Sequence, residues 1–213
     1  MERPLLKGGL SLVGLQPRAR LGGWLLMLVF LDFEASSLSK VSYPIEVGWI
    51  FDDGRTGEFL IRPAPQWTDW SEEAAGIHGI DREALTRDGV PLEDVAQTML
   101  EVLSGHDLVA SAPSWDGKWL STLLRAAGQP RHALRLRATE EVLRECALAL
   151  LAPHMSAEAL SSAVDRVLAQ SSRPQTEKPA HRALADAIAE RDRWLTARQV
   201  ATALIEEDRR AHG

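Results

Sequence analysis

Five side chains in this sequence have the types and the spacing needed to hold divalent cations and to move a proton. Asp32 and Glu34 stand two residues apart, at the end of a continuously apolar run. Asp116 follows a short apolar segment, and His181 precedes Asp186 by five residues. Carboxylate oxygens are the ligands that Mg²⁺ prefers, and an imidazole can accept a proton near neutral pH.

The Asp32–Glu34 pair is the first candidate for a metal site. If the run before it is a strand, both side chains point to the same face, because side chains alternate along a strand. Two carboxylates on one face repel each other unless a cation lies between them. Acids are also common in solvated turns at strand ends, so this pair alone leaves both interpretations open.

The remaining candidates also have structural interpretations when each is taken alone. Asp116 opens a predicted helix, where the helix dipole favours a carboxylate without any metal. His181 and Asp186 lie roughly 140° apart around an ideal helix. They can therefore share a site only if His181 lies on the loop just before the helix, an arrangement that Pro179 favours. The alternative is a surface histidine and a solvated aspartate.

The elements that must position these residues follow the order β-β-β-α-β-α-β-α. A continuously apolar run reads as a central strand covered on both faces, and Asp52-Asp53-Gly54 is a hairpin turn signal. A meander followed by alternating strands and helices predicts an α/β fold, a mixed sheet with helices on both faces. The predicted strands are 24–32, 43–51, 57–62, 107–111 and 134–137, and the predicted helices are 91–104, 116–127, 139–151, 156–170, 180–190 and 195–209, with a loop and short helix over 67–79 and a loop over 171–179.

Short motifs in a fixed order resemble the DEDDh exonucleases, a superfamily that includes oligoribonuclease, ribonuclease T and the proofreading epsilon subunit of bacterial DNA polymerase. The motifs are DFEAS, SYPIEVGWI, IHGI, a strand leading into WD, and HRALADA, and they span residues 25–190. The resemblance implies the ribonuclease H-like fold, which has the element order above. It also implies a metal-dependent 3′–5′ exonuclease that releases 5′-mononucleotides from single-stranded RNA or DNA by a two-metal mechanism.

The resemblance implies a role for each candidate. Asp32, Glu34, Asp116 and Asp186 would hold two Mg²⁺ ions, for which Mn²⁺ would substitute, and His181 would take the proton from the attacking water. The implied partner is the 3′ end of a single-stranded nucleic acid. By the same resemblance, a second group closes around the terminal nucleotide: Ser36, Leu38, Ile77, His78 and Ile80.

Two positions depart from the family's pattern. The asparagine usual four residues before the second-motif aspartate is Ala112 here, so the grip on the strand or the choice of substrate is expected to differ. Trp115 stands where phenylalanine is usual, and we expect it in the core. The alternative function is therefore a catalytically weak or inactive nucleic-acid-binding module on the same fold. A ribonuclease H-like endonuclease is less well supported, because the histidine motif belongs to the exonuclease branch.

Composition limits how the chain can bind nucleic acid. The formal net charge of −6 argues against binding by bulk charge, so a strand would have to follow a local basic cluster such as Arg131, Arg135 and Arg137. The single cysteine, Cys146, excludes an intramolecular disulfide. It suits a reducing compartment, and the cytoplasm is the predicted location.

The N-terminal part of the chain allows two interpretations. We expect residues 1–22 to be a flexible extension and residues 23–213 to form the exonuclease domain with a helical C-terminal part. A basic segment, an apolar run and Ala35-Ser36-Ser37 also resemble a signal peptide, although Asp32 and Glu34 follow the run at once. The run over 24–31 is far short of the ~20 residues that span a bilayer, so no membrane partner is expected.

Overall fold

The computed structural model describes residues 20–21, 24–172 and 181–212. Its centre is a six-stranded mixed sheet in the order β6-β5-β4-β3-β7-β8. A separate pair, β1 (Arg20–Leu21) and β2 (Trp24–Leu25), is antiparallel. The sheet strands are β3 (Leu28–Ala35), β4 (Pro44–Phe51), β5 (Thr56–Arg62), β6 (Val90–Pro91), β7 (Asp107–Ala110) and β8 (Leu136–Ala138).

The first three sheet strands form the predicted meander. β3 pairs antiparallel with β4, and β4 pairs antiparallel with β5. The chain reverses between β4 and β5 at the predicted turn, where Gly54 has a φ of 95°, a conformation that glycine adopts without steric cost. β7 pairs parallel with β3, and β8 with β7, so β3 is a central strand as expected.

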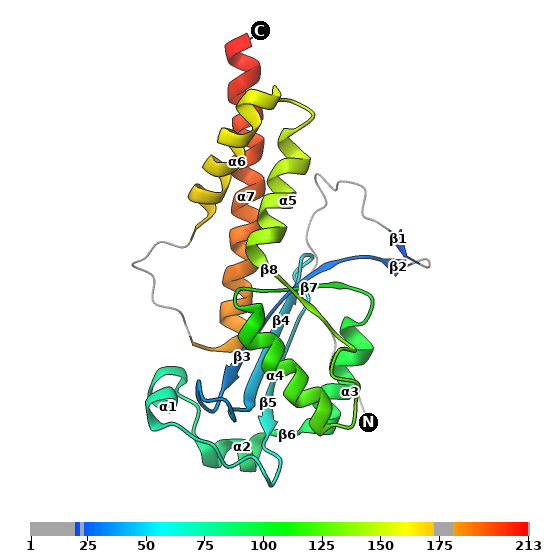
Figure 1. Ribbon diagram of the computed structural model, residues 1–213, viewed down its shortest axis with the longest axis vertical. Helices are drawn as coiled ribbons and strands as arrows, with labels where there is room; N and C mark the ends of the chain where they lie inside the picture. Colours follow the sequence, from blue (N-terminus) through cyan, green and yellow to red (C-terminus); the bar gives the residue numbers. More distant parts are fainter. Residues whose placement is uncertain (1–19, 22–23, 173–180, 213) are drawn as a thin grey trace.

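Helices cover both faces of this sheet (Figure 1), which confirms the predicted α/β architecture. Two short helices and two longer ones lie around the meander. Three more extend beyond the sheet at the C-terminal end of the chain. The bounds are α1 (Glu72–His78), α2 (Arg82–Asp88), α3 (Leu92–Leu103), α4 (Pro113–Ala126), α5 (Thr139–Leu151), α6 (Ala157–Ser171) and α7 (Ala183–His212).

Alternation along β3 divides the core into two parts. Val29, Leu31 and Phe33 pack with the buried faces of α3 and α4. Phe30 packs with the buried faces of α5, α6 and α7. Because side chains alternate along a strand, Asp32 and Glu34 lie on the same side of the sheet as Phe30, toward α7.

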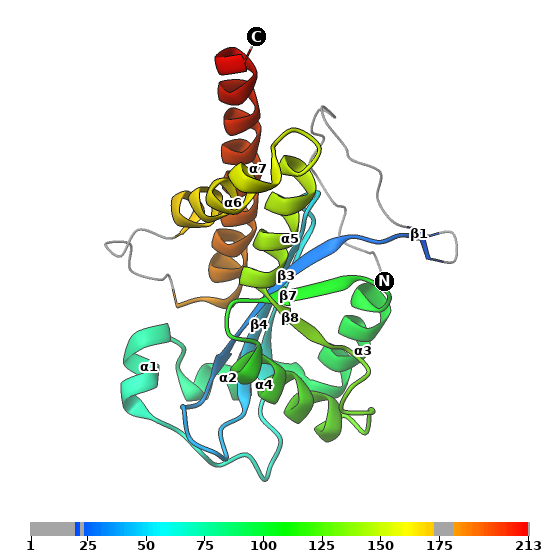
Figure 2. The same cartoon turned by 45° about the horizontal axis from the view of Figure 1, so that its top comes forward.

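Two predicted boundaries are wrong. The strand expected over 24–32 enters the main sheet only at Leu28, because residues 24–25 pair with β1 instead. The helices expected over 180–190 and 195–209 are one 30-residue helix, α7, seen along its length in Figures 1 and 2. The charged stretch at Arg191 to Arg193 contains no glycine or proline, and the helix continues through it because Trp194 is buried in the core.

Several predictions fall where little or nothing is described. Residues 1–19 and 22–23, which include most of the expected N-terminal extension, lie outside the described residues. The predicted loop over 171–179 is described only at its first two residues, and Ser171 ends α6. Among the described helices, none combines the length and apolar character needed to span a bilayer.

Candidate active site

Three of the predicted metal ligands converge between the sheet and α7. One carboxylate oxygen from each of Asp32, Glu34 and Asp186 lies within 4.8 Å of the other two. The first two come from β3 and the third from the first turn of α7. All three side chains are only partly buried, so the group stays accessible to an ion. Three hard oxygen ligands at this separation fit a divalent cation such as Mg²⁺ or Mn²⁺.

The close approach of α7 depends on a glycine in the neighbouring strand. Gly48, in β4, is paired with Asp32 of β3 in the strand register. A Cβ atom at this position would lie only 2.2 Å from the backbone nitrogen of Leu184. A side chain there would therefore push the start of α7 off the sheet and carry Asp186 away from Asp32.

Asp116 is the fourth predicted ligand. It lies in the first turn of α4, which begins at Pro113, three residues earlier than predicted. Its side chain is 2% exposed, and its Oδ2 atom has no hydrogen-bond partner among the described residues. Its charge raises the pKa of Asp32. Asp116 is not one of the three side chains in the group that lies within 4.8 Å, so its role as a fourth ligand stays a prediction.

The acids strongly affect one another's ionisation. Burial, followed by the charges of Asp116, Glu34 and Asp186, raises the pKa of Asp32 well above its usual value. Burial, then Asp186, raises the pKa of Glu34 to about 7, although Arg182 opposes the shift. Burial raises the pKa of Asp116 to about 7, against backbone hydrogen bonds that lower it. A bound cation would favour the ionised forms and reverse these shifts.

His181 lies on the segment just before α7, although the helix was predicted over 180–190. This is the placement that sharing a site with Asp186 requires. It has a φ of 49°, a left-handed conformation that is uncommon for a residue with a side chain. Burial lowers the pKa of the nearby His78, and the charges of Arg182 and His181 add to this shift. His181 is half-buried, which leaves its ring accessible to a water molecule or a substrate.

The five residues predicted to bind the terminal nucleotide divide into two groups. Leu38 and Ile77 are 72% and 53% exposed, which is unusual for large apolar side chains. Ser36, His78 and Ile80 are buried. Ile80 packs in a small core, so contact of its side chain with a nucleotide is not expected in this conformation. The roles of all five remain predictions.

A cluster of serines organises the loop that carries Leu38. The hydroxyl groups of Ser36, Ser37 and Ser39 all donate to the carboxylate of Asp69. Burial acts to raise the pKa of Asp69, but these three hydrogen bonds outweigh it and hold the pKa below its usual value. Asp69 therefore fixes the loop that carries two of the predicted nucleotide-binding residues, Ser36 and Leu38.

The solved structures that resemble this chain are exonucleases. No family model and no curated protein matches it. The structure of E. coli Exonuclease I in complex with a dT13 oligonucleotide matches with a TM-score of 0.56 at 16% sequence identity, over 78% of this chain and 40% of that chain. Exonuclease I from Methylocaldum szegediense matches with a TM-score of 0.54 at 18% identity, over 82% of this chain and 41% of that chain.

The chain has the fold of these exonuclease I structures. A zinc-bound form of the E. coli ExoI–ssDNA complex has the same fold, with a TM-score of 0.58 at 16% identity, over 84% of this chain and 41% of that chain. The predicted ribonuclease H-like architecture is thereby confirmed. The chain spans about two fifths of the length of these structures.

On this exonuclease fold, Trp115 corrects one expectation. We expected it in the core, but it is 38% exposed and lies tilted against the buried ring of Trp119, with 5.6 Å between the ring centroids. The Nζ atom of Lys118 lies 5.0 Å from the centroid of its ring. The reason is its position next to Asp116: in the first turn of α4, one residue faces the core and its neighbour faces outward.

Two buried acids beside the candidate site were not predicted. Glu46, in β4, is paired with Glu34 of β3 in the strand register. Glu190 lies one turn beyond Asp186 on α7. Both are charged residues at nearly full burial. An acid inside the apolar run YPIEVGWI was the available signal for Glu46, since charged side chains are rarely buried without a partner. The four-residue spacing from Asp186 was the signal for Glu190.

Proposed function

We propose that the chain is a metal-dependent 3′–5′ exonuclease acting on single-stranded nucleic acid. The observation that carries the proposal is the convergence of Asp32, Glu34 and Asp186 within 4.8 Å on a DEDDh exonuclease fold. Asp116 adds a buried carboxylate oxygen with no hydrogen-bond partner among the described residues. A carboxylate in that state is costly to bury, and a cation is the partner it would fit.

The proposed division of labour follows from the chemistry of each side chain. The acids would hold two divalent cations, which when bound stabilise the attacking and the leaving oxygen of a phosphodiester. His181 would accept the proton of the attacking water at a ring nitrogen. Leu38 and Ile77 would contact the terminal base, because exposed apolar side chains beside an acidic site suit the face of a base.

The polarity of the reaction would follow from closure around the 3′ end. The residues predicted to close around the terminal nucleotide would leave no path beyond it for a continuing strand. Only a free end would therefore enter. The expected products are 5′-mononucleotides released in order from the 3′ end. Bases in a duplex would first have to unstack, at a cost of a few kcal/mol per step, so single strands are the favoured substrate.

One observation favours the alternative, a weakly active or inactive nucleic-acid-binding module. Ala112 stands at the N-cap of α4, where the side chain makes no capping hydrogen bond. The family's usual asparagine would offer an amide at this position, next to the site. If the absence of this amide weakens binding of the nucleic-acid strand, the activity should be weak, and Ala112→Asn should raise it.

The test is cleavage of 5′-end-labelled RNA and DNA oligonucleotides with Mg²⁺, Mn²⁺ or EDTA. We expect a ladder that shortens from the 3′ end with either metal and no cleavage with EDTA. A 3′-phosphate is expected to block the reaction, because its charge would face the carboxylates. Binding without cleavage under every condition would favour the alternative. Cutting of a circular strand as fast as a linear one would refute the exonuclease assignment.

A further inference from the structure

Glu46 is fully buried yet lies outside the set of predicted ligands. It stands opposite Glu34 in the register of β3 and β4. Its two carboxylate oxygens accept hydrogen bonds from Arg182, with the Nε atom 3.0 Å from each. Its Oε2 atom also accepts a hydrogen bond from the backbone N–H of Ala183, at 2.9 Å.

These contacts hold the chain at the start of α7. Ala183 is the first residue of that helix, and its N–H would otherwise be one of the donors that a helix leaves without a partner. The Asp186 N–H in turn donates to the carbonyl oxygen of Arg182, at 3.0 Å. The Glu46 carboxylate therefore holds Arg182 and Ala183, the two residues that directly follow His181.

These hydrogen bonds of Glu46 affect the position of His181 most directly. This residue adjoins Arg182 and has a φ of 49°, a conformation that persists only when the surrounding structure holds it. Asp186 has additional support, since the helix packs closely on Gly48. Loss of the Glu46 hydrogen bonds would leave the start of α7 packed on the sheet. The segment that carries the His181 imidazole would no longer be held in place.

We propose that Glu46, acting through Arg182 and the Ala183 N–H, is a positioning residue that sets the placement of His181 relative to the acids. The inference rests on the proposed function, in which His181 is the base. Glu46 itself touches neither metal nor substrate. A bidentate arginine–carboxylate pair fixes direction as well as distance, which is the property a proton acceptor needs.

The burial of the two partners decides which variant is informative. The side chain of Arg182 is 47% exposed, whereas that of Glu46 is not exposed at all. Removal of Arg182 would leave a buried carboxylate uncompensated and would destabilise the fold. Glu46→Gln keeps the size of the side chain and leaves an arginine that can reach water. Glu58→Gln is the matched control, because Glu58 is 40% exposed and its Oε1 atom lies 3.8 Å from Arg182.

The first experiment is a double-mutant cycle on turnover of a single-stranded oligonucleotide. Glu46→Gln should lower kcat by about 10–100-fold, the range seen when an outer partner of a site residue is lost, with KM and Mn²⁺ affinity changed little. Glu58→Gln should stay near wild type. Because Glu46 acts through His181, Glu46→Gln should lower kcat no further in a His181→Ala background. Losses that multiply in the double variant, or wild-type kcat in Glu46→Gln, overturn the proposal.

The second experiment does not depend on turnover. Amide hydrogen exchange is measured for residues 181–186 in the wild type, Glu46→Gln and Glu58→Gln. We expect faster exchange at the Ala183 amide in Glu46→Gln alone, with protection of the β3 and β4 amides retained. Unchanged exchange at Ala183 overturns the positioning role even if the wild type does not cleave. Absence of cleavage by the wild type counts against the proposed function instead.

Discussion

Two groups of acids meet α7 about one helical turn apart, and their charge environments differ. Asp32, Glu34 and Asp186 face one another within 4.8 Å, and the pKa values of the two β3 acids are raised. Farther along the helix, Glu190 accepts from the Nη1 atom of Arg193 at 3.0 Å.

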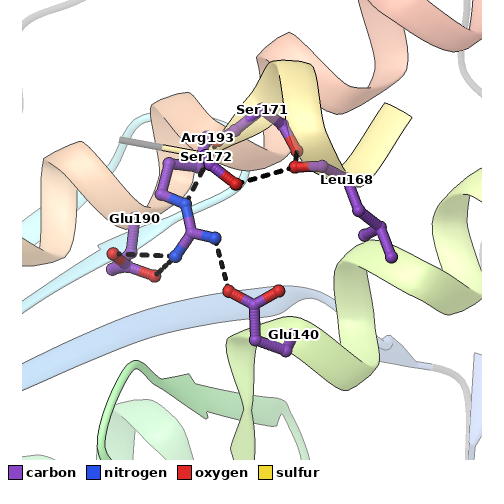
Figure 3. A network of polar contacts seen from close by, with 6 residues as sticks. All are labelled: Glu140, Leu168, Ser171, Ser172, Glu190 and Arg193. Atoms are coloured by element: carbon purple, nitrogen blue, oxygen red, sulfur yellow. Dashed lines mark hydrogen bonds and ion pairs between the residues drawn. The ribbon is translucent and has the colours of Figure 1, made fainter. Parts of the chain in front are cut away.

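The second group is a network built around one arginine (Figure 3). The Arg193 guanidinium also donates to Glu140 on α5 and to the carbonyl oxygen of Ser171 on α6. It therefore joins three helices through charge-assisted hydrogen bonds. The comparison teaches that the fold supplies a cation where the acids hold structure together. At the proposed substrate site, the pKa values of Asp32 and Glu34 are raised, and a bound cation would favour their ionised forms.

The largest expected effect comes from removing an acid of the first group. Asp32→Ala should reduce cleavage to background, a loss of at least about 10²–10³-fold by analogy with other removed electrostatic groups. Removal of one acid also relieves repulsion, so the free energy of unfolding without metal should stay level or rise slightly. Cleavage assays and urea unfolding in EDTA check both parts.

The matched control for Asp32 is Asp165→Ala. Asp165 is an exposed acid on α6, 3.8 Å from Arg144, and its loss should change neither cleavage nor stability appreciably. Near wild-type turnover in Asp32→Ala would remove this residue from the mechanism.

His181 separates metal binding from proton transfer at the same site. His181→Ala should lower kcat by about 10²–10⁴-fold, the usual contribution of a general base. Mn²⁺ affinity should be retained, because the carboxylates are the proposed ligands. Calorimetric titration with Mn²⁺ and steady-state kinetics provide the two measurements. Parallel losses of affinity and rate would make His181 a ligand instead.

The second group should respond to mutation through stability. Arg193→Ala removes a charged partner of Glu190, whose side chain is 7% exposed, and we expect a loss of roughly 3 kcal/mol in the free energy of unfolding. Arg166→Ala is the control, because Arg166 and Glu207 are both more than half exposed. That loss should stay below about 1 kcal/mol. Equal losses in the two variants, measured by urea unfolding, would remove the contrast between the networks.

The smallest expected effect is a pH dependence confined to the first group. The pKa of Glu34 rises from 4.5 to about 7 in the folded protein, so the native state binds more protons than the unfolded state between those values. Its contribution to stability therefore decreases as pH rises through this window. Saturating Mn²⁺ should abolish the decrease, because the cation favours the ionised form.

The measurement is thermal unfolding of wild type and Glu34→Gln between pH 4.5 and 7.5 in EDTA and in Mn²⁺. In EDTA, the wild type should lose stability relative to Glu34→Gln as pH rises, and the curves should no longer diverge in this way in Mn²⁺. A wild type that gains stability relative to Glu34→Gln over this window would contradict the prediction.

The local parts of the fold could be predicted from the sequence. The turn at Gly54 and the apolar run ending in Asp32 determine the meander, since backbone conformation and alternation are properties of a few adjacent residues. α5 was predicted with the bounds it has, 139–151. Pro179 favours the observed position of His181 before α7, although the predicted helix began at residue 180.

Only the tertiary structure decided which charges meet. The pairing of Glu46 with Arg182 joins residues 136 positions apart, and the closeness of α7 to β3 depends on Gly48 in a third element. Arg193, in the charged middle of α7, likewise has partners on two other helices, Glu140 on α5 and the carbonyl oxygen of Ser171 on α6. Desolvation and Coulomb interactions act through space and not along the chain, so the sequence by itself determined the acids, and the packed fold determined which of them a metal ion would have to neutralise.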